Sequence, residues 1–212
     1  MKAVPPLVRR LPGPGPRVVA VPGLGLSVDV PARTLARLSP AAGSLVVALP
    51  GYGEPVRPGA ALSVTAQADR LLERLGGLGV GPAVLLGHSA SCQVVVRAAV
   101  RAPDRVTGLV LVGPTTDPRA AGWGGLAGRW LRTAAWERPG QVPTLVRDYT
   151  HSGAPGMARA MDAARHDRIV RALATVTGPV LVVRGKHDRI APAEWTATLA
   201  AVAPRGRAVT LP

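Results

Sequence analysis

The stretch LLGHSAS, residues 85–91, decides how this chain folds. It continues an apolar run that starts at Ala83 and precedes a helical stretch near residues 90–101. A strand that leads through Gly-x-Ser-x-small into a helix is typical of a nucleophile elbow, a sharp turn that exposes a serine hydroxyl above a sheet. The helix N-terminus adds positive potential and free N–H groups at this point. The stretch therefore predicts a strand–turn–helix unit with Ser89 at its tip, and the alternative is an ordinary serine that caps a helix.

The neighbours of Ser89 are given simpler roles. His88 precedes the serine on the turn, so its side chain points away from the hydroxyl and serves a structural or pocket-edge role. Ser91 stands where glycine is more usual, and serine is small enough for the close approach of strand and helix. Cys92 follows on the helix and is interpreted as a small core residue.

Outward from this stretch, short apolar runs bounded by Gly or Pro alternate with helical patterns, which predicts βαβ units and a mostly parallel α/β sheet. The runs are apolar throughout, so we expect the sheet to be buried on both faces. The predicted strands are Arg17–Val21, Leu45–Leu49, Ala83–Leu86, Val106–Val112, Val180–Val183 and Ala208–Leu211. The predicted helices lie near residues 31–38, 63–76, 90–101 and 192–203.

Two segments depart from this alternation. Residues 1–16 are rich in Pro and Gly and are expected to form a loosely ordered lead-in. Residues 114–178 contain no convincing strand, and helical patterns near 142–150 and 155–174 predict a helical cap insertion. The predicted core is therefore residues 1–113 with 179–212. The insertion holds Trp123, Trp130, Trp136 and Tyr149, which either pack its own small core or line a substrate pocket.

Composition limits the classes of protein further. The chain has 212 residues, 47% of them hydrophobic, which predicts a buried core and either one domain or one domain with an insertion. The net charge is +14, and Lys2 and Lys186 are the only lysines among 26 basic residues. The arginines are scattered and aromatic residues make up 3%, so we expect a compositional bias and no nucleic-acid partner.

The remaining composition concerns location. Cys92 is the single cysteine, which excludes an intrachain disulfide and a cysteine-based metal site. No signal peptide or membrane span is apparent. We therefore expect a cytoplasmic protein without a membrane partner, of unknown oligomeric state.

The chain resembles the α/β-hydrolase fold superfamily, of the serine hydrolase or esterase-like kind. The resemblance rests on the elbow, on APDRV (102–106) and LVLVG (109–113) after it, on residues 45–53 and 67–75 before it, and on residues 180–192. It implies a parallel sheet flanked by helices, a helical cap insertion and abbreviated terminal elements. It also implies that Ser89 is a nucleophile activated by a His–acid pair, which cleaves an ester or related carbonyl bond of a small apolar substrate with no cofactor and no metal.

The resemblance places the acid after a late strand, in the turn GKHDRIAP, residues 185–192. Asp188 would orient the imidazole and stabilise its charged form. The alternatives are that Asp188 caps the helix at 192–203, or that the acid is Asp117, after the Val106–Val112 strand. His187 is expected to face solvent.

The resemblance also assigns the oxyanion hole to two backbone N–H groups. One belongs to Ala90, after the nucleophile, and the other to Leu24 in the loop after the first strand. Pro22 stands where the family often has histidine, and a plain glycine-rich turn is the alternative. Gly23 and Gly25 also resemble part of a dinucleotide fingerprint, but its third glycine and acidic partner are missing, so NAD binding is rejected.

The family's base histidine follows the last core strand, and no histidine of this chain occupies that position. The four histidines are His88, His151, His166 and His187. We expect that the chain is truncated before its base and has little turnover; the alternative is a shortened relative without the chemistry, such as a non-catalytic ligand-binding protein. Besides Ser89, Asp188, Leu24 and Ala90, the pocket candidates are His88, Trp123, Trp130 and Trp136.

Overall fold

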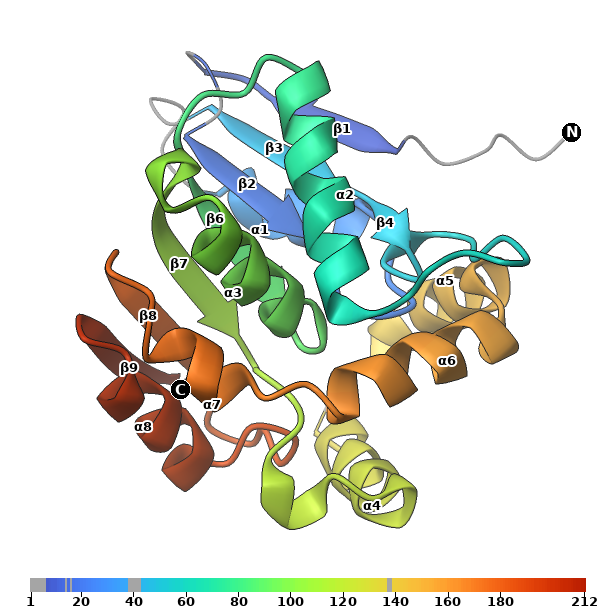
Figure 1. The fold of residues 1–212 in the computed structure, drawn as a ribbon. Coiled ribbons are helices and arrows are strands. Elements are labelled where there is room, and N and C mark those ends of the chain that lie inside the picture. The colour runs from blue at the N-terminus through green and yellow to red at the C-terminus, as the bar shows by residue number, and fades with distance from the viewer. Residues whose placement is uncertain (1–6, 14, 16, 38–42, 137–138) are drawn as a thin grey trace, which may run out of the picture.

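A computed structural model describes residues 7–13, 15, 17–37, 43–136 and 139–212. Its main sheet has seven strands in the order β1-β3-β2-β6-β7-β8-β9, and every pairing is parallel except that of β1 with β3 (Figure 1). The strands are β1 (Val8–Leu11), β2 (Val18–Val21), β3 (Ser44–Val47), β6 (Ala83–His88), β7 (Val106–Val112), β8 (Val180–Gly185) and β9 (Gly206–Leu211). A separate two-stranded sheet pairs β4 (Leu49–Pro50) with β5 (Gly53–Glu54).

Helices connect the parallel strands, as the alternating pattern predicts. The helices are α1 (Asp29–Leu35), α2 (Val64–Gly77), α3 (Ser91–Arg101), α4 (Trp123–Ala134), α5 (Val142–Ser152), α6 (Ala154–Arg165), α7 (Ile169–Leu173) and α8 (Ala193–Val202). Short 3₁₀ turns lie at Pro103–Arg105, Pro118–Ala120 and Pro139–Gln141. The mostly parallel sheet flanked by helices and interrupted by a helical insertion is confirmed.

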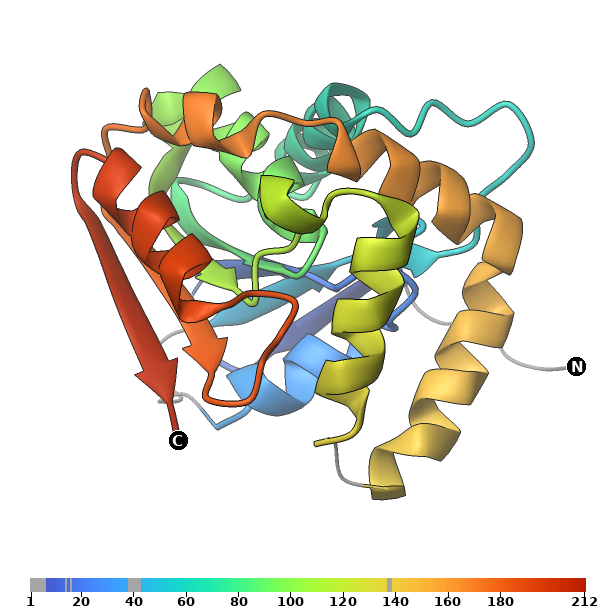
Figure 2. The same ribbon diagram turned by 90° about the horizontal axis from the view of Figure 1, so that it is seen from below.

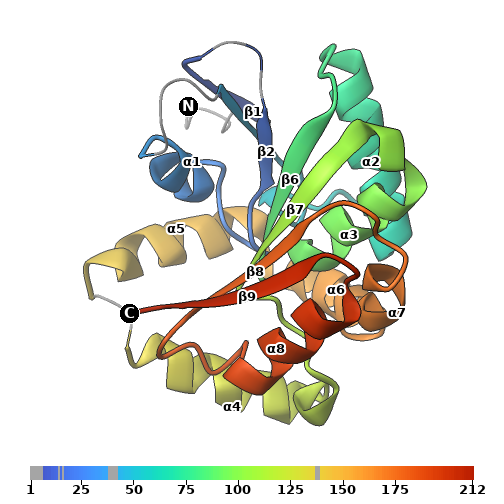
Figure 3. The same ribbon diagram turned by 90° about the vertical axis from the view of Figure 1, so that its left-hand side faces the viewer.

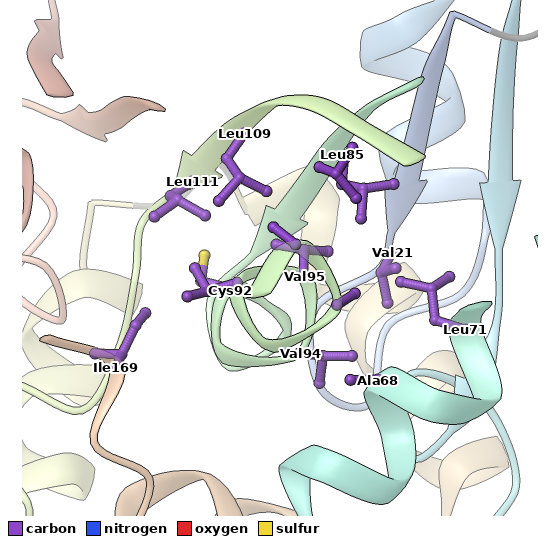
Figure 4. Packing of buried hydrophobic residues seen from close by; sticks show 14 of the residues in the cluster. Val21, Ala68, Leu71, Leu85, Cys92, Val94, Val95, Leu109, Leu111 and Ile169 are labelled. Carbon is purple, nitrogen blue, oxygen red and sulfur yellow. The ribbon is translucent and has the colours of Figure 1, made fainter. Parts of the chain in front are cut away.

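The period of two along the strands divides the core into two layers. Val19 and Val21 of β2 pack in the large apolar cluster with α2 and α3, whereas Ala20 packs with α1 on the opposite face. Figure 3 shows α1 on one side of the sheet and α2 and α3 on the other. In Figure 4 Cys92 lies inside the large cluster, which confirms it as a core residue.

The prediction of a sheet buried on both faces is confirmed for β3, whose side chains are all buried, and is wrong for β6 and β8. Side chains along β6 and β8 alternate between buried and partly exposed. One face of the sheet is covered by four helices, α2, α3, α7 and α8. Within the described residues, the helix on the other face is α1, which contacts β1 and β3.

Two further expectations need correction. Part of the predicted lead-in forms β1, which pairs with β3 along the edge of the sheet; residues 1–6, 14 and 16 lie outside the described residues. The helical pattern at 155–174 is divided into α6 and α7, because the backbone leaves the helical region at Arg168.

The helical insertion lies over one end of the sheet. Helices α4, α5 and α6 lie beyond the carboxyl ends of β6 and β7 (Figures 1 and 2). In contrast, α7 packs on α3, with Ile169 and Leu173 in the core cluster. The insertion therefore covers the end of the sheet where the elbow stands, and the exact bounds 114 and 178 stay a prediction.

Candidate active site

The elbow places Ser89 on a strained turn between β6 and α3. Ser89 has φ +55°, a left-handed conformation that is uncommon for a residue with a side chain. Its N–H donates to the carbonyl of Val112 at the end of β7, over 2.8 Å. A side chain at Gly87 would put a Cβ 2.8 Å from Cys92 Cα and from Val95 Cγ2, so any larger residue here would force β6 and α3 apart. Strain of this kind, held by surrounding contacts, is typical of functional sites.

Ser91, the departure from the usual glycine, has a defined role in the turn. Its side chain is buried, and its Oγ accepts a hydrogen bond from the N–H of His88 over 2.8 Å. The same oxygen lies 3.0 Å from the carbonyl of Val21 at the end of β2, to which the hydroxyl can donate. The hydroxyl thus links the elbow to the neighbouring strand, a contact that the sequence reasoning missed.

The carboxylate of Asp188 lies on the turn between β8 and α8. Its Oδ1 accepts from the N–H groups of Ile190 (2.8 Å) and Ala191 (2.9 Å), so it organises this turn and does not cap α8, whose N-cap is Pro192. A Cβ at Gly113, which has φ +53°, would lie 3.0 Å from Oδ2. The carboxylate therefore stands against the end of β7, the strand next to the elbow strand.

Arg184 holds this acid turn from inside and was also missed by the sequence reasoning. Its side chain is buried at the end of β8. Nε donates to the carbonyl of Ala191 over 2.8 Å, and Nη2 donates to the carbonyls of Asp188 (2.9 Å) and Lys186 (3.2 Å). Three charge-assisted bonds to one turn fix the backbone that carries Asp188.

The loop after β2 carries Leu24, which lines the same cavity as Ser89. Within the described residues, the N–H groups of Leu24 and Ala90 have no hydrogen-bond acceptor, whereas Gly25 N–H donates to the carbonyl of Gly51 over 2.8 Å. Unpaired N–H groups from this loop and from the residue after the serine are what an oxyanion hole requires. A Cβ at Gly23 would lie 2.7 Å from His88 Nδ1, so the imidazole packs directly on this loop.

A cavity of about 700 Å³ joins these parts. Ser89, Asp188, His88 and Leu24 contribute to its wall. The insertion contributes the apolar side chains Trp123, Trp130, Trp136, Leu145, Tyr149, Met157 and Met161. The structure thus brings the predicted serine, the predicted acid and three of the four tryptophans to one cavity.

The model of the alpha/beta hydrolase family matches residues 18–212. The chain belongs to the alpha/beta hydrolase family. Solved structures of hydrolases share its fold over nearly the whole chain. An E-2-(acetamidomethylene)succinate hydrolase is 26% identical, with a TM-score of 0.75, and the match covers 97% of this chain and 85% of that one.

Two other similar structures act on esters or lactones according to their names. An esterase from Exiguobacterium antarcticum is 18% identical with a TM-score of 0.80, covering 97% of this chain and 86% of that one. An enol-lactonase from Burkholderia xenovorans is 21% identical with a TM-score of 0.75, covering 96% and 86%. The search of curated proteins found no match. This chain therefore has the alpha/beta hydrolase fold found in esterases and lactonases.

The histidines of this alpha/beta hydrolase lie as follows. His88 lines the cavity, and burial lowers its pKa below the usual value, an effect that the nearby Asp188 carboxylate partly offsets. His187, expected to face solvent, is only partly exposed: it also lines the cavity and stacks on Trp136 with ring centroids 4.0 Å apart. His151 is exposed on α5. His166 is also exposed, and its Nδ1 lies 2.8 Å from the carbonyl oxygen of Asp162.

None of these rings hydrogen-bonds Ser89 or the Asp188 carboxylate within the part of the chain that the structure describes. Pro212, directly after β9, lines the cavity. Within the described residues, therefore, no histidine is placed to act as the general base for Ser89.

The carboxylate of Asp117, the alternative acid, pairs with two arginines. Its buried carboxylate accepts from Arg129 Nη1 over 2.7 Å and from Arg119 Nε over 3.0 Å. Burial alone would raise the pKa of Asp117, but the hydrogen bonds from Arg119 and Arg129 outweigh it and lower the pKa. Arg119 also pairs with Glu194 of α8, so this cluster ties the insertion to the core.

The described residues offer neither a cluster of metal ligands nor a helix that could cross a membrane. No group of three or more His, Cys, Asp or Glu side chains among them is placed to hold a metal ion. None of their helices combines the length and the apolar character that crossing a membrane requires.

Proposed function

We propose that this alpha/beta hydrolase uses Ser89 as a nucleophile to cleave an ester or related carbonyl bond of a small apolar substrate. The observation that carries the proposal is the left-handed turn at Ser89, which opens into a cavity shared with Asp188 and the apolar insertion. Similarity to an esterase and an enol-lactonase supports a carbonyl substrate. The size and apolar lining of the cavity support a small substrate without extended polar groups.

In this mechanism Ser89 Oγ attacks the carbonyl carbon, and its proton passes to a general base. The N–H groups of Leu24 and Ala90 hydrogen-bond the oxygen on which negative charge develops. The alcohol leaves with a proton and an acyl-enzyme forms. Water then attacks the acyl carbon and releases the acid, which restores the Ser89 hydroxyl.

Asp188 would orient and stabilise the charged base, and Arg184 would keep this carboxylate in place. For the 212-residue polypeptide we expect weak turnover, because no histidine hydrogen-bonds Ser89. Loss of the base typically costs several orders of magnitude, while an oxyanion hole retains about 10³–10⁴-fold catalysis over water.

The test is hydrolysis of 4-nitrophenyl butyrate by the 212-residue polypeptide, with and without imidazole as an external base. We expect weak hydrolysis that imidazole increases in a saturable way, and none above background in Ser89→Ala. Equal rates for the two proteins in imidazole would overturn the proposal. Reading the coding DNA past codon 212 adds an independent outcome: a histidine within a few codons identifies the base, whereas a stop codon favours the alternative.

The alternative function is a non-catalytic ligand-binding protein of the same fold. The observation that favours it is the lack of a hydrogen-bonded histidine at Ser89 within the described residues. It predicts saturable quenching of tryptophan fluorescence by an apolar ester such as 4-nitrophenyl butyrate, without turnover and without any effect of imidazole.

A further inference from the structure

Helix α5 buries two polar side chains against the loop that carries Leu24. Asp148 and Ser152 are the buried residues of this helix, four positions apart and therefore on one face. Asp148 Oδ2 accepts from the N–H of Ser27 over 2.9 Å. Ser152 Oγ donates to the carbonyl of Gly25 over 3.0 Å. Both bonds join the helical insertion to the loop after β2, across more than a hundred residues of sequence.

This arrangement differs from ordinary helix packing. A helix usually buries an apolar face, and a buried carboxylate is costly unless it is paired and hydrogen-bonded. Here Arg147 supplies the pairing through Nη2 (2.8 Å) and Nε (3.0 Å) to Asp148 Oδ1. The second oxygen is thereby left for Ser27 N–H. A charge-assisted bond of this kind fixes a backbone group in direction as well as in distance.

The loop itself is held tightly between core and insertion. Gly25 has φ +77°, and a Cβ there would lie 2.5 Å from Met157 Sδ and 2.7 Å from Tyr149 Cδ1. From the core, the carbonyl of Gly51 accepts from Gly25 N–H over 2.8 Å. The loop is therefore bonded at residues on the C-terminal side of Leu24, while the Leu24 N–H has no acceptor among the described residues.

We propose that Asp148 and Ser152 are positioning residues that aim the Leu24 N–H at the carbonyl oxygen of the substrate. The helical insertion then sets the geometry of the oxyanion hole as well as the walls of the cavity. This inference rests on the proposed function of Ser89 and Leu24. It accounts for a buried Asp–Ser face on a helix that has no apolar residue fully buried.

The first test measures the rate at which a fluorophosphonate labels Ser89 in the 212-residue chain, with imidazole as base. Misplacement of an oxyanion-hole donor predicts a loss of about 10- to 100-fold in Asp148→Ala and in Ser152→Ala. Asp148→Asn keeps an acceptor for Ser27 N–H, so its rate should stay within about three-fold of the parent. With 4-nitrophenyl butyrate the same variants should lower kcat and leave KM unchanged, because the interaction strengthens in the transition state.

Matched controls separate positioning from general damage to the insertion. Asp162→Ala removes a half-exposed carboxylate of α6 that also pairs with an arginine, and Thr150→Ala removes an exposed hydroxyl of α5. Both should label at the parent rate. Equal losses in the controls, or a parent rate in Asp148→Ala and Ser152→Ala, would overturn the inference.

The second test does not depend on activity. Hydrogen exchange of a peptide that covers residues 21–28 reports whether the loop is held. The Ser27 amide should exchange slowly in the parent and in Asp148→Asn, and at least about ten-fold faster in Asp148→Ala. Unchanged exchange in a folded Asp148→Ala protein refutes the positioning role. If the Ser27 amide exchanges faster in Asp148→Ala but Ser89 of the parent is not labelled, the contact between α5 and the loop is supported. The proposed function is then refuted.

Discussion

Replacing Ser91 by glycine, the residue more usual at this position, should destabilise this protein. The change removes the acceptor for the N–H of His88 and the donor to the carbonyl of Val21, both at a buried site. An unsatisfied buried N–H costs about 1–3 kcal/mol, and the lost bond to the carbonyl costs about 1 kcal/mol. Glycine in the first turn of α3 adds about 0.5 kcal/mol relative to serine.

The expected loss for Ser91→Gly is therefore about 2.5–4.5 kcal/mol in the free energy of unfolding, measured by urea denaturation. For a chain of this size each kcal/mol corresponds to about 2–4 °C in Tm. Ser91→Ala removes the same hydrogen bonds, but alanine favours the helix over glycine by about 1 kcal/mol, so this variant should lose about 1 kcal/mol less than Ser91→Gly. Thr198→Ala, which removes an exposed hydroxyl from α8, is the control and should change stability by less than about 0.5 kcal/mol.

An unchanged or higher stability of Ser91→Gly would refute this reasoning. It would show that the serine hydroxyl contributes nothing to the elbow and that the position selects only for small size. A loss in Ser91→Gly but none in Ser91→Ala would assign the effect to the backbone freedom of glycine, which also contradicts the hydrogen-bond account.

Three other predictions follow from the site. Arg184→Met leaves three carbonyls of the acid turn without their donor and should lower the free energy of unfolding by about 3 kcal/mol in urea denaturation, whereas the exposed Arg205→Met should have no effect. Gly87→Ala places a Cβ 2.8 Å from the backbone of Cys92 and should lower Tm by about 4 °C or more in a thermal melt. Burial lowers the pKa of His88, so as pH falls this histidine takes up a proton in the unfolded chain before it does so in the folded one. The free energy of unfolding should therefore fall as pH drops below about 6.5. In a His88→Asn variant the urea midpoint should fall less between about pH 8 and about pH 5.

The core of the fold could be predicted because its signals are local and repeated. Val106–Val112 forms β7 with the predicted bounds, since an apolar run between polar turns has few other solutions. The elbow was recognised because glycine, serine and a following helix must be adjacent in sequence. Helix α4 was not predicted, since Gly124, Gly125 and Gly128 lower its helix propensity. Strand β1 was missed because prolines and glycines surround only four residues that pair with β3.

The parts of the site that were missed depend on contacts between distant segments. In the sequence, Arg184 resembles an ordinary polar residue at the end of a strand. Only the folded turn after it shows that its side chain holds the Asp188 backbone. His187 was expected in solvent because nothing in the sequence places Trp136 of the insertion beside it. Asp148 and Ser152 likewise resemble surface residues of an amphipathic helix until the loop after β2 is seen against them. Such contacts bring residues together from different elements, and a single sequence carries no local signal for them.

The most direct test of the central claim is to locate the adduct after prolonged treatment of the 212-residue chain with a fluorophosphonate in the presence of imidazole. Trypsin releases residues 75–97 as one peptide, and fragmentation distinguishes Ser89 from Ser91 and Cys92. We predict one adduct, on Ser89, and no adduct on this peptide in Ser89→Ala. An unlabelled Ser89, or labelling that persists on this peptide in Ser89→Ala, would contradict the account of Ser89 as the nucleophile.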